Sequence, residues 1–423
     1  MDLIAEIITI GNELTTGFQI DTNGPYLAER FQSRGIIVQR MITVGDDRSS
    51  ISRAIRESMA RADVVVVTGG LGPTSDDITT EAAARLLGRK MRLYPEALEH
   101  VENLMGSLRL EMNEGQKKQA YFPENAELIP NFIGSAYGYL IKEANRMLFF
   151  LPGVPREMEA MVERTILPRI KKERKNRRHY RTRALMVFGI SEAEADELLQ
   201  DLPQQDKDGQ ISFLPRFPEI RIRITVQASS SQEADEKLLY WEKEIRKRLA
   251  PYIFGVDGET MEKAVGELLR EANATIAVAE SCTGGLIGHR LTNVPGSSEY
   301  VDRIVVTYSN QAKVDLLNVP EDIINVHGAV SEPTAHFMAQ GIRNSAGTTF
   351  GLATTGIAGP AGDSPGKPVG TVFISLAAGN ETWTKLYHFS GNRLQIKKMT
   401  SQIALNRVRK YLLKKNLGQS LTR

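Results

Sequence analysis

The chain has 423 residues, which at roughly 150 residues per domain predicts two or three domains. It carries 53 basic and 51 acidic residues, and a net charge of +2 argues against a globally basic nucleic-acid binder. The one cysteine, Cys282, excludes an internal disulfide and a cysteine-rich zinc site and favours a reducing compartment. No apolar run approaches the roughly 20 residues that span a bilayer. The first residues lack a secretory pattern, so we expect a cytoplasmic protein with no membrane partner.

The first part of the chain alternates strand-like and helix-like patterns. Short apolar runs predict strands over residues 3–10, 62–68 and 146–151, and a helical stretch follows each of them. Continuous runs of Val, Ile and Leu are typical of a parallel sheet that is covered on both faces. Glycine-rich loops follow these runs, at the strand ends where such sheets bind ligands. We therefore expect an α/β domain with a binding site at this edge.

A dense basic run over residues 168–183 predicts a domain boundary. It is either a solvated helix end with a linker, or a contact for phosphate or nucleic acid. The block 184–255 that follows has the pattern of a small α+β module, with strands over 185–188 and 220–226 and helices over 192–202 and 232–249. This pattern resembles a KH-like domain, but the block contains no Gly-x-x-Gly clamp, so RNA binding by that route is unsupported.

The last block begins near residue 257 and again mixes strands with helices. It predicts helices over 262–272 and 394–413, and strands over 275–279, 304–307, 350–354 and 369–377. The fold class that we predict is α/β, with two three-layer α/β/α domains joined by the small KH-like α+β module. The predicted domains are residues 1–170, 171–255 and 256–423.

The most informative segment of the first domain is 68–79, Thr-Gly-Gly-Leu-Gly-Pro-Thr-Ser-Asp-Asp-Ile-Thr. Glycines after a strand let backbone amides approach a phosphate, and the next helix points its N-terminal amides at the same place. Asp76 and Asp77 either cap this helix or hold a divalent cation against a phosphorylated ligand. The residues alone leave both interpretations open.

This segment, with Asp76, Asp77 and Thr79, resembles the molybdopterin-binding-like fold. The runs Gly11-Asn12-Glu13-Leu14, Asp21-Thr22-Asn23 and Leu151-Pro152-Gly153-Val154-Pro155 resemble the CinA branch of that fold, and the resemblance extends over nearly the whole chain. It implies an ADP-ribose pyrophosphatase that uses a divalent metal (Mg, Mn or Co). The residues that it implies for substrate binding are Asn12, Glu13, Gly69, Gly70 and Gly72, and for the metal Asp46, Asp76 and Asp77.

Hydroxyl-bearing side chains gather in four segments of the last block: 279–285, 307–313, 328–332 and 354–360. A hydroxyl becomes a nucleophile when a base takes its proton, and no histidine is an obvious partner. Lys313 can be that base if burial lowers its pKa, or it is an exposed helix lysine. Ser281 and Cys282 compete as nucleophiles, and Cys282 can equally be a small core residue. The residues alone do not decide between them.

These four segments resemble the CinA C-terminal domain, the nicotinamide mononucleotide deamidase family, which converts that nucleotide to nicotinate mononucleotide and ammonia. The resemblance implies Ser281 as nucleophile and Lys313 as base, Tyr308 and Thr355 as orienting or proton-transfer groups, and no cofactor. Arg393 pairs with the phosphate in this scheme. The other implied substrate-binding residues are Thr283, Gly284, Gly285, Asn310, Gly356, Gly359 and Gly370. Asp363 and Asn392 depart from the family pattern.

The implied partners are therefore two small nucleotides, nicotinamide mononucleotide and ADP-ribose, and a second copy of the chain in a homodimer. Nucleic acid is not an expected partner. Two rival hypotheses remain. In the first, the protein is a non-catalytic nucleotide-binding or DNA-transaction partner linked to competence. In the second, the protein is an enzyme whose first domain is a pterin binder or an inactive scaffold.

Overall fold

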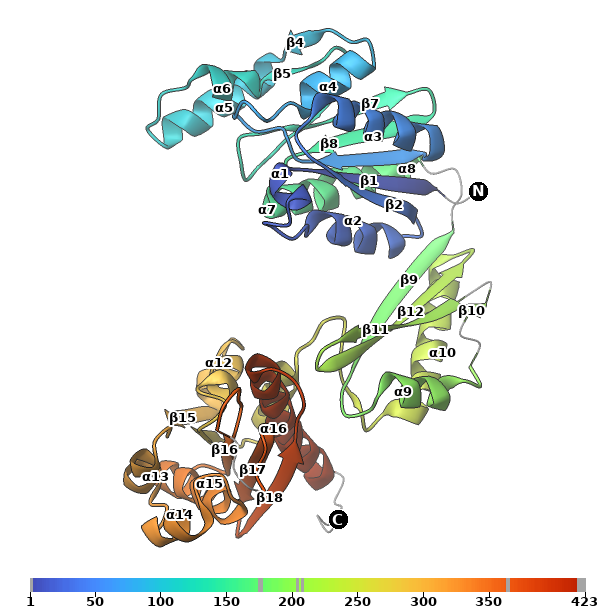
Figure 1. Cartoon of the computed structure of the whole chain (residues 1–423). Coiled ribbons are helices and arrows are strands. Elements are labelled where there is room, and N and C mark those ends of the chain that lie inside the picture. The colour runs from blue at the N-terminus through green and yellow to red at the C-terminus, as the bar shows by residue number, and fades with distance from the viewer. Residues whose placement is uncertain (1–2, 174–177, 203–204, 207–208, 363–365, 417–423) are drawn as a thin grey trace. The chain divides into compact units, whose positions relative to one another are not determined.

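The computed structural model describes residues 3–173, 178–202, 205–206, 209–362 and 366–416 (Figure 1). Asp363 and part of the basic run, 174–177, lie outside the described residues. The chain forms two compact units, one of residues 1–182, 206–209 and 225–240 and the other of residues 183–205, 210–224 and 241–423. None of the described helices combines the length and the apolar character that crossing a membrane requires.

The first unit contains a six-stranded sheet in the order β2-β1-β3-β8-β7-β6. Its strands are β1 (Ile4–Ile10), β2 (Ile37–Val44), β3 (Val64–Thr68), β6 (Glu127–Ile129), β7 (Gly138–Glu143) and β8 (Arg146–Leu151). The first four in the order are parallel, whereas β7 and β6 are antiparallel additions at one side. The predicted strand 146–151 is confirmed. The strands predicted over 3–10 and 62–68 are also present, as β1 and β3, but they begin one and two residues later than predicted.

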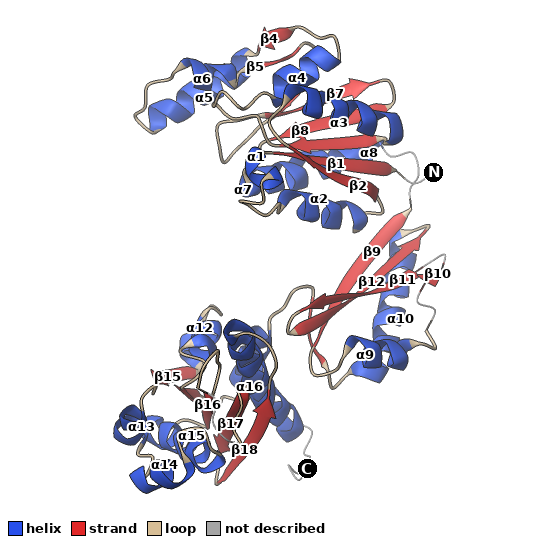
Figure 2. Ribbon diagram, in the orientation of Figure 1, coloured by secondary structure: helices blue, strands red, loops and turns tan. Residues whose placement is uncertain are grey.

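Helices cover both faces of this sheet (Figure 2). Ala5 and Ile7 of β1 face the core under α2 (Asn23–Gln32), α7 (Pro155–Met161) and the π-helical η1 (Val162–Ile166), which α8 (Leu167–Glu173) continues. Ile8 and Ile10 face the opposite core under α3 (Arg48–Arg61) and α4 (Thr79–Leu86). Because both faces of β1 are buried, the strand is apolar apart from Glu6 and Thr9. The remaining elements are α1 (Asn12–Thr15), β4 (Met91–Leu93), α5 (Pro95–Ser107), α6 (Glu114–Lys118) and β5 (Tyr121–Pro123).

The KH-like module has a five-stranded sheet in the order β10-β11-β12-β9-β13. Its elements are β9 (His179–Val187), α9 (Glu192–Leu199), β10 (Gln205–Asp206), β11 (Gly209–Arg216), β12 (Glu219–Ala228), α10 (Ser231–Leu249) and β13 (Ile253–Val256). Burial alternates strictly along β12, as the sequence predicts for a half-exposed strand. The predicted strand 185–188 is the buried end of the longer β9.

The second unit contains another five-stranded sheet, in the order β15-β14-β16-β17-β18. Its strands are β14 (Ile276–Glu280), β15 (Val301–Val306), β16 (Phe350–Gly356), β17 (Thr371–Ala378) and β18 (Glu381–His388). The first three in the order are parallel and the last two antiparallel.

Two helical layers cover this sheet as well. Ile276 and Val278 of β14 pack under α11 (Met261–Glu271), α12 (Leu286–Thr292) and α16 (Arg393–Asn416). Ala277 and Ala279 pack under α13 (Asn310–Leu317), α14 (Glu321–His327) and α15 (Glu332–Ala346). A short 3-10 turn, η2 (Ser297–Glu299), precedes β15. The predicted fold class is confirmed, and the domain boundaries at 170 and 255 stay predictions.

Candidate functional site

Parallel pairing brings three hydroxyl-bearing loops to one edge of the C-terminal sheet. The Ser281 amide, directly after β14, donates to the Thr354 carbonyl at 3.0 Å. The Thr307 amide, directly after β15, donates to the Glu280 carbonyl at 2.8 Å. Ser281, Thr307 and Thr355 therefore lie at neighbouring strand ends, although they are far apart in the sequence. Ligands commonly bind at such an edge.

Lys313 is buried at this edge, so the interpretation as an exposed helix lysine is wrong. It lies in the first turns of α13, where the Ser309 hydroxyl accepts from the Ala312 amide and caps the helix. Its side chain is 1% exposed, and its Nζ donates to the Thr307 carbonyl at 2.9 Å and lies 3.4 Å from Ser281 Oγ. Burial lowers the pKa of Lys313 because the charged ammonium loses water.

Ser281 and Cys282 are adjacent in the chain but occupy different environments. Ser281 is 8% exposed, and its Oγ faces the Lys313 amine. Cys282 is part of the hydrophobic core with Ile287 and Leu291 of α12, and burial raises the pKa of its thiol to about 12. A thiol with this pKa stays protonated at neutral pH and is a poor nucleophile. Cys282 is a core residue, as one of the sequence interpretations had it.

The loop after β14 is held by a buried carboxylate that precedes the serine. Glu280 is fully buried, and its carboxylate accepts from the amides of Ile287 at 3.2 Å and Gly288 at 2.8 Å, in the first turn of α12. The Gly284 amide donates to the Ser281 carbonyl at 3.1 Å, and Gly285 immediately precedes the helix. Glu280 thus joins β14 to α12 and fixes the loop that carries Ser281.

Arg393 and Lys397 bring two cations from α16 toward the same edge. Arg393 donates from Nη1 to the Gly359 carbonyl at 2.7 Å and from Nη2 to the Tyr308 hydroxyl at 2.9 Å. Lys397 pairs with none of the described residues, and its Nζ lies 3.4 Å from the position that a Cβ on Gly284 would occupy. Sequence reasoning missed Lys397. The available signal was its place four residues after Arg393, on the same helix face.

The side chains of two other predicted residues at this edge, Thr283 and Thr355, form hydrogen bonds within the protein. The Thr283 and Thr354 hydroxyls contact each other at 2.8 Å and are buried, so Thr283 can reach a substrate only through its backbone. The Thr355 hydroxyl donates to the Ala329 carbonyl at 2.8 Å. Asn310 is exposed at the first position of α13.

The predicted glycines at this edge are required by close backbone packing. Gly370 has φ +95°, and a Cβ there would lie 1.8 Å from the Phe389 carbonyl oxygen. A Cβ on Gly356 would lie 2.7 Å from the Thr371 carbonyl oxygen, and one on Gly359 would lie 2.6 Å from a Val369 methyl. A side chain at any of these positions would displace the loops, whether or not a nucleotide contacts them.

The N-terminal sheet also gathers its predicted residues at the carboxyl ends of its strands. The Asn12 amide donates to the Asp46 carboxylate at 2.8 Å, and the Asp46 amide donates to Asn12 Oδ1 at 3.1 Å. Burial raises the pKa of Asp46, and the neighbouring charges of Asp76, Glu13 and Asp77 raise it further. The negative charges of Asp76, Glu13 and Asp77 therefore act on Asp46, and concentrated negative charge attracts a cation.

Asp76 and Asp77 do not cap α4, so that interpretation is wrong. The helix begins after Ile78 without a side-chain cap, because both carboxylates bind Thr74 instead. Asp77 accepts from the Thr74 amide at 2.9 Å and from its hydroxyl at 2.6 Å, and the same hydroxyl contacts Asp76 and lowers the pKa of that carboxyl. Lys118 Nζ donates to the carbonyls of Thr74 at 3.1 Å and Asp77 at 2.5 Å.

The glycines of the same loop make close approaches that a side chain would prevent. Gly69 has φ +110°, and a Cβ there would lie 2.2 Å from the Ile10 carbonyl oxygen. A Cβ on Gly70 would lie 2.1 Å from Thr79 Oγ1, and one on Gly72 would lie 2.5 Å from the Asp77 carboxylate. Among the residues that the structure describes, no three His, Cys, Asp or Glu side chains group closely enough to form a metal site by themselves.

Three family models together match almost the whole chain. They are a probable molybdopterin binding domain over residues 6–172, the damage-inducible protein CinA KH domain over 182–255, and the CinA C-terminal domain over 258–412. The matches define a protein with these three domains in this order.

Relatives of similar length carry the same name. The chain is 43% identical to a CinA-like protein from Geotalea uraniireducens over 406 residues, which cover 96% of this chain and 97% of the relative. It is 45% identical to a CinA-like protein from Syntrophus aciditrophicus over 408 residues, with coverages of 96% and 97%. The chain therefore belongs to the CinA family. A solved CinA structure of unknown function from Thermoplasma acidophilum is 31% identical and covers 41% of this chain and 98% of its own, with a TM-score of 0.37.

Proposed function

We propose that the C-terminal domain hydrolyses the carboxamide of nicotinamide mononucleotide to nicotinate mononucleotide and ammonia. The observation that carries this proposal is the pair of Lys313 and Ser281, with Nζ 3.4 Å from Oγ. Burial lowers the pKa of Lys313, which increases the fraction of neutral amine that can take the proton of a hydroxyl. A serine activated by a buried lysine is an established solution for acyl transfer.

In the proposed reaction, Ser281 Oγ attacks the carboxamide carbon while its proton passes to Lys313 Nζ. The Lys313 ammonium then returns the proton to the departing nitrogen, and ammonia leaves a seryl ester. Water attacks this ester with Lys313 again taking a proton, and the carboxylic acid and the free Ser281 hydroxyl are released. The serine and the lysine supply both the nucleophile and the proton transfers.

The phosphate of the nucleotide needs a cation, and two are available on α16. Arg393 already donates to Gly359 and Tyr308, so its main effect is to hold these two loops together. Lys397 pairs with none of the described residues and lies close to the Gly284 backbone, so it is the better candidate for the phosphate. Arg393 then positions Tyr308, a proposed orienting residue, at the rim of the site.

The serine assignment is tested by comparing Ser281→Ala with Cys282→Ala. We expect Ser281→Ala to abolish ammonia release from nicotinamide mononucleotide, because it removes the hydroxyl that lies 3.4 Å from Lys313 Nζ. Cys282→Ala should retain most of the activity, because the thiol is buried and protonated. Ammonia is measured by a coupled assay on proteins matched for folding by circular dichroism. The reverse pattern of activities would refute the assignment.

We also propose that the N-terminal domain cleaves ADP-ribose to AMP and ribose 5-phosphate with a divalent metal. The support is the gathering of Asp46, Asp76 and Asp77 beside the glycine loop. Carboxylate oxygens suit Mg²⁺ or Mn²⁺, and Mg²⁺ is usually held by one or two carboxylates together with substrate phosphates. This donor set therefore fits a metal that protein and diphosphate hold jointly. When bound, the metal would neutralise the charge of the diphosphate.

The acidic pair is tested by the double change Asp76→Asn and Asp77→Asn. Asparagine keeps the size of each side chain and its hydrogen bonds to Thr74, but removes the charge that attracts a cation. We expect metal-dependent release of AMP from ADP-ribose to fall by at least about a hundredfold. Deamidation by the same protein should be unchanged, and circular dichroism of the double variant controls for the folding of the N-terminal domain. Cleavage at the wild-type rate would refute the metal role.

A further inference from the structure

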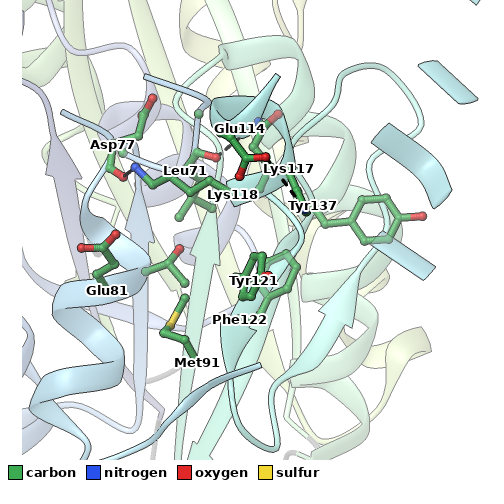
Figure 3. A pocket seen from close by; sticks show the side chains of 14 residues that line it. Leu71, Asp77, Glu81, Met91, Glu114, Lys117, Lys118, Tyr121, Phe122 and Tyr137 are labelled. Atoms are coloured by element: carbon green, nitrogen blue, oxygen red, sulfur yellow. Dashed lines mark hydrogen bonds and ion pairs between the residues drawn. The ribbon is translucent and has the colours of Figure 1, made fainter. Parts of the chain in front are cut away.

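A cavity of about 610 Å³ lies beside α8 and the start of β9, and all of its lining residues belong to the first compact unit. We name it the α8–β9 cavity. Arg34 and Ile36 line it and precede β2, so it lies at the amino ends of the parallel strands, whereas the glycine loop follows the carboxyl end of β3. Figure 3 shows the cavity beside that loop, around Leu71 and Asp77, and the two cavities share no lining residue. The α8–β9 cavity is therefore separate from the proposed pyrophosphatase site.

Part of the lining of the α8–β9 cavity is apolar. Ile36, Leu167 and Ile170 line it and are only 1–4% exposed. The Tyr180 ring, which also lines it, lies against the backbone of Gly35, where a Cβ would approach a ring carbon to 2.1 Å. Glycine at this position, with φ +67°, therefore lets the ring pack there. A cavity of this size with apolar and aromatic lining fits a small organic molecule.

Positive charge dominates the rest of the lining. Beside His179 and one carboxylate, Glu163, the cavity has five cationic side chains: Arg34, Lys171, Lys172, Arg178 and Arg181. Arg181 is neutralised by Asp235, with Nε 2.6 Å from Oδ1. Arg178 donates to the neutral amide oxygen of Gln227 at 3.2 Å, which leaves its charge in place. Four cations therefore remain against the single carboxylate.

The two lysines of α8 carry charge that the protein does not pair. Lys171 and Lys172 are exposed, and neither forms a hydrogen bond or an ion pair with a described residue. The carboxylate that follows them, Glu173, pairs instead with Lys142 at 2.8 Å and with Arg169 at 3.9 Å. An anion can therefore bind the two lysines without first breaking an ion pair.

The carboxylate of Glu163 compensates Arg34 only in part, because three groups share it. Arg30 Nε donates to Glu163 Oε1, the Tyr26 hydroxyl donates to the same oxygen at 3.2 Å, and Arg34 Nη2 donates to Oε2 at 3.4 Å. Burial lowers the pKa of Arg34, and the neighbouring charge of Arg30 lowers it further in spite of the Glu163 contact. An anion beside Arg34 would stabilise its charged form.

We propose that the α8–β9 cavity binds a small organic phosphate, with the phosphate group among Arg34, Lys171 and Lys172 and the apolar part against Tyr180 and the buried lining. The cations come from the end of α2, from α8 and from the residue before β9, and they line one hollow, which suits a compact anion. A nucleic-acid backbone is instead held by charges spread along an extended stripe or face. For the basic run 168–183, the cavity thus favours the phosphate interpretation over nucleic acid.

Labelling of lysines in the full chain tests the proposal, with phenyl phosphate as the probe. An acylating reagent modifies exposed amines, and a bound phosphate shields the amines that it contacts. A chelator is present, so that no divalent metal recruits the probe to the glycine loop. We expect phenyl phosphate that fills most of the sites to slow acylation of Lys171 and Lys172 at least about fivefold, as measured by mass spectrometry of peptides. Lys243, which is exposed on α10, is the internal control and should react at an unchanged rate.

The probe concentration that gives half-protection measures what the cavity contributes. Arg34→Gln should raise this concentration at least about fivefold, because a charge that faces the phosphate is lost. Arg53→Gln is the matched control, since Arg53 is exposed on α3 of the same unit and does not line the cavity. Inorganic phosphate should need at least about fivefold more than phenyl phosphate, because it has no ring to bury against the apolar lining.

Three results would overturn the proposal. The first is a failure of phenyl phosphate to protect Lys171 and Lys172, and it needs no variant. If a short DNA duplex then protected these two lysines and spared Lys243, the basic run would be a nucleic-acid contact. The second is an unchanged half-protection concentration in Arg34→Gln, which would place the anion on α8 outside the cavity. The third is equal protection by inorganic and phenyl phosphate, which would remove the organic part of the ligand.

Discussion

Lys313 is the residue on whose burial the proposed deamidation depends. Its side chain is buried against Thr307 and Ser281, and burial lowers its pKa from the usual value of 10.5. A base acts in its deprotonated form, so kcat/KM for deamidation should rise with pH through the pKa of Lys313 and level off above it. The rise should therefore fall below pH 10.5. The measurement is a pH–rate profile of ammonia release by the full chain.

Lys313→Arg is the matched variant for this profile, since arginine keeps the positive charge but does not lose its proton in this pH range. We expect kcat to fall by roughly 10²–10⁴, the usual contribution of a general base. Binding of nicotinate mononucleotide by calorimetry should change far less and so reports on folding. An unchanged profile in Lys313→Arg would assign the base to another group.

The choice between Ser281 and Cys282 shows where residue-level prediction stops. Both are potential nucleophiles beside a glycine pair, and composition and spacing treat them alike. Their difference is burial: the thiol packs in the core, whereas the hydroxyl faces Lys313. Burial at one strand end depends on the helix that packs there, which the local sequence does not specify. The resemblance to a family selected Ser281, and the pKa shifts give a physical reason for it.

At the scale of elements, Glu280 is the connection between β14 and α12. Glu280→Ala would leave the buried amides of Ile287 and Gly288 without an acceptor. We expect the free energy of unfolding of the C-terminal unit to fall by roughly 2–6 kcal/mol, since each of the two unsatisfied buried donors costs about 1–3 kcal/mol. Urea titration followed by Trp383 fluorescence, in a Trp241→Phe background, measures it. The exposed Glu381→Ala is the control, and equal losses in the two variants would contradict the prediction.

The elements that the sequence predicted well are those with buried apolar runs. β8 has its predicted bounds because Arg146–Leu151 is buried on both faces. β18 was not predicted, because Glu381–His388 is mostly polar and exposed at the edge of its sheet. β9 was predicted only at its buried end for the same reason. The edges that carry the candidate sites were predictable because such runs indicate parallel strands, whose carboxyl ends lie at one edge of a sheet. The Thr74 contacts that replace a helix cap were not predictable.

At the scale of the whole molecule, the two candidate sites belong to different compact units and use different chemistry. In the reactions that we propose, Ser281 and Lys313 are the nucleophile and base of the C-terminal site, whereas the N-terminal site depends on the charge of Asp76 and Asp77. Adding a chelator to the full chain should therefore end AMP release from ADP-ribose and leave ammonia release from nicotinamide mononucleotide unchanged. Mg²⁺, Mn²⁺ or Co²⁺ should restore the first activity.

Variants that alter one site at a time test the independence of the two activities in both directions. Ser281→Ala should cleave ADP-ribose at the wild-type rate and respond to the chelator as the unaltered chain does. The Asp76→Asn, Asp77→Asn chain should deamidate at the wild-type rate with or without it. If the chelator also stopped deamidation, a metal would be required at the C-terminal site, and proton transfer between a serine and a lysine would not be a sufficient account of it. Independent loss of each activity is what two sites on separate α/β domains require.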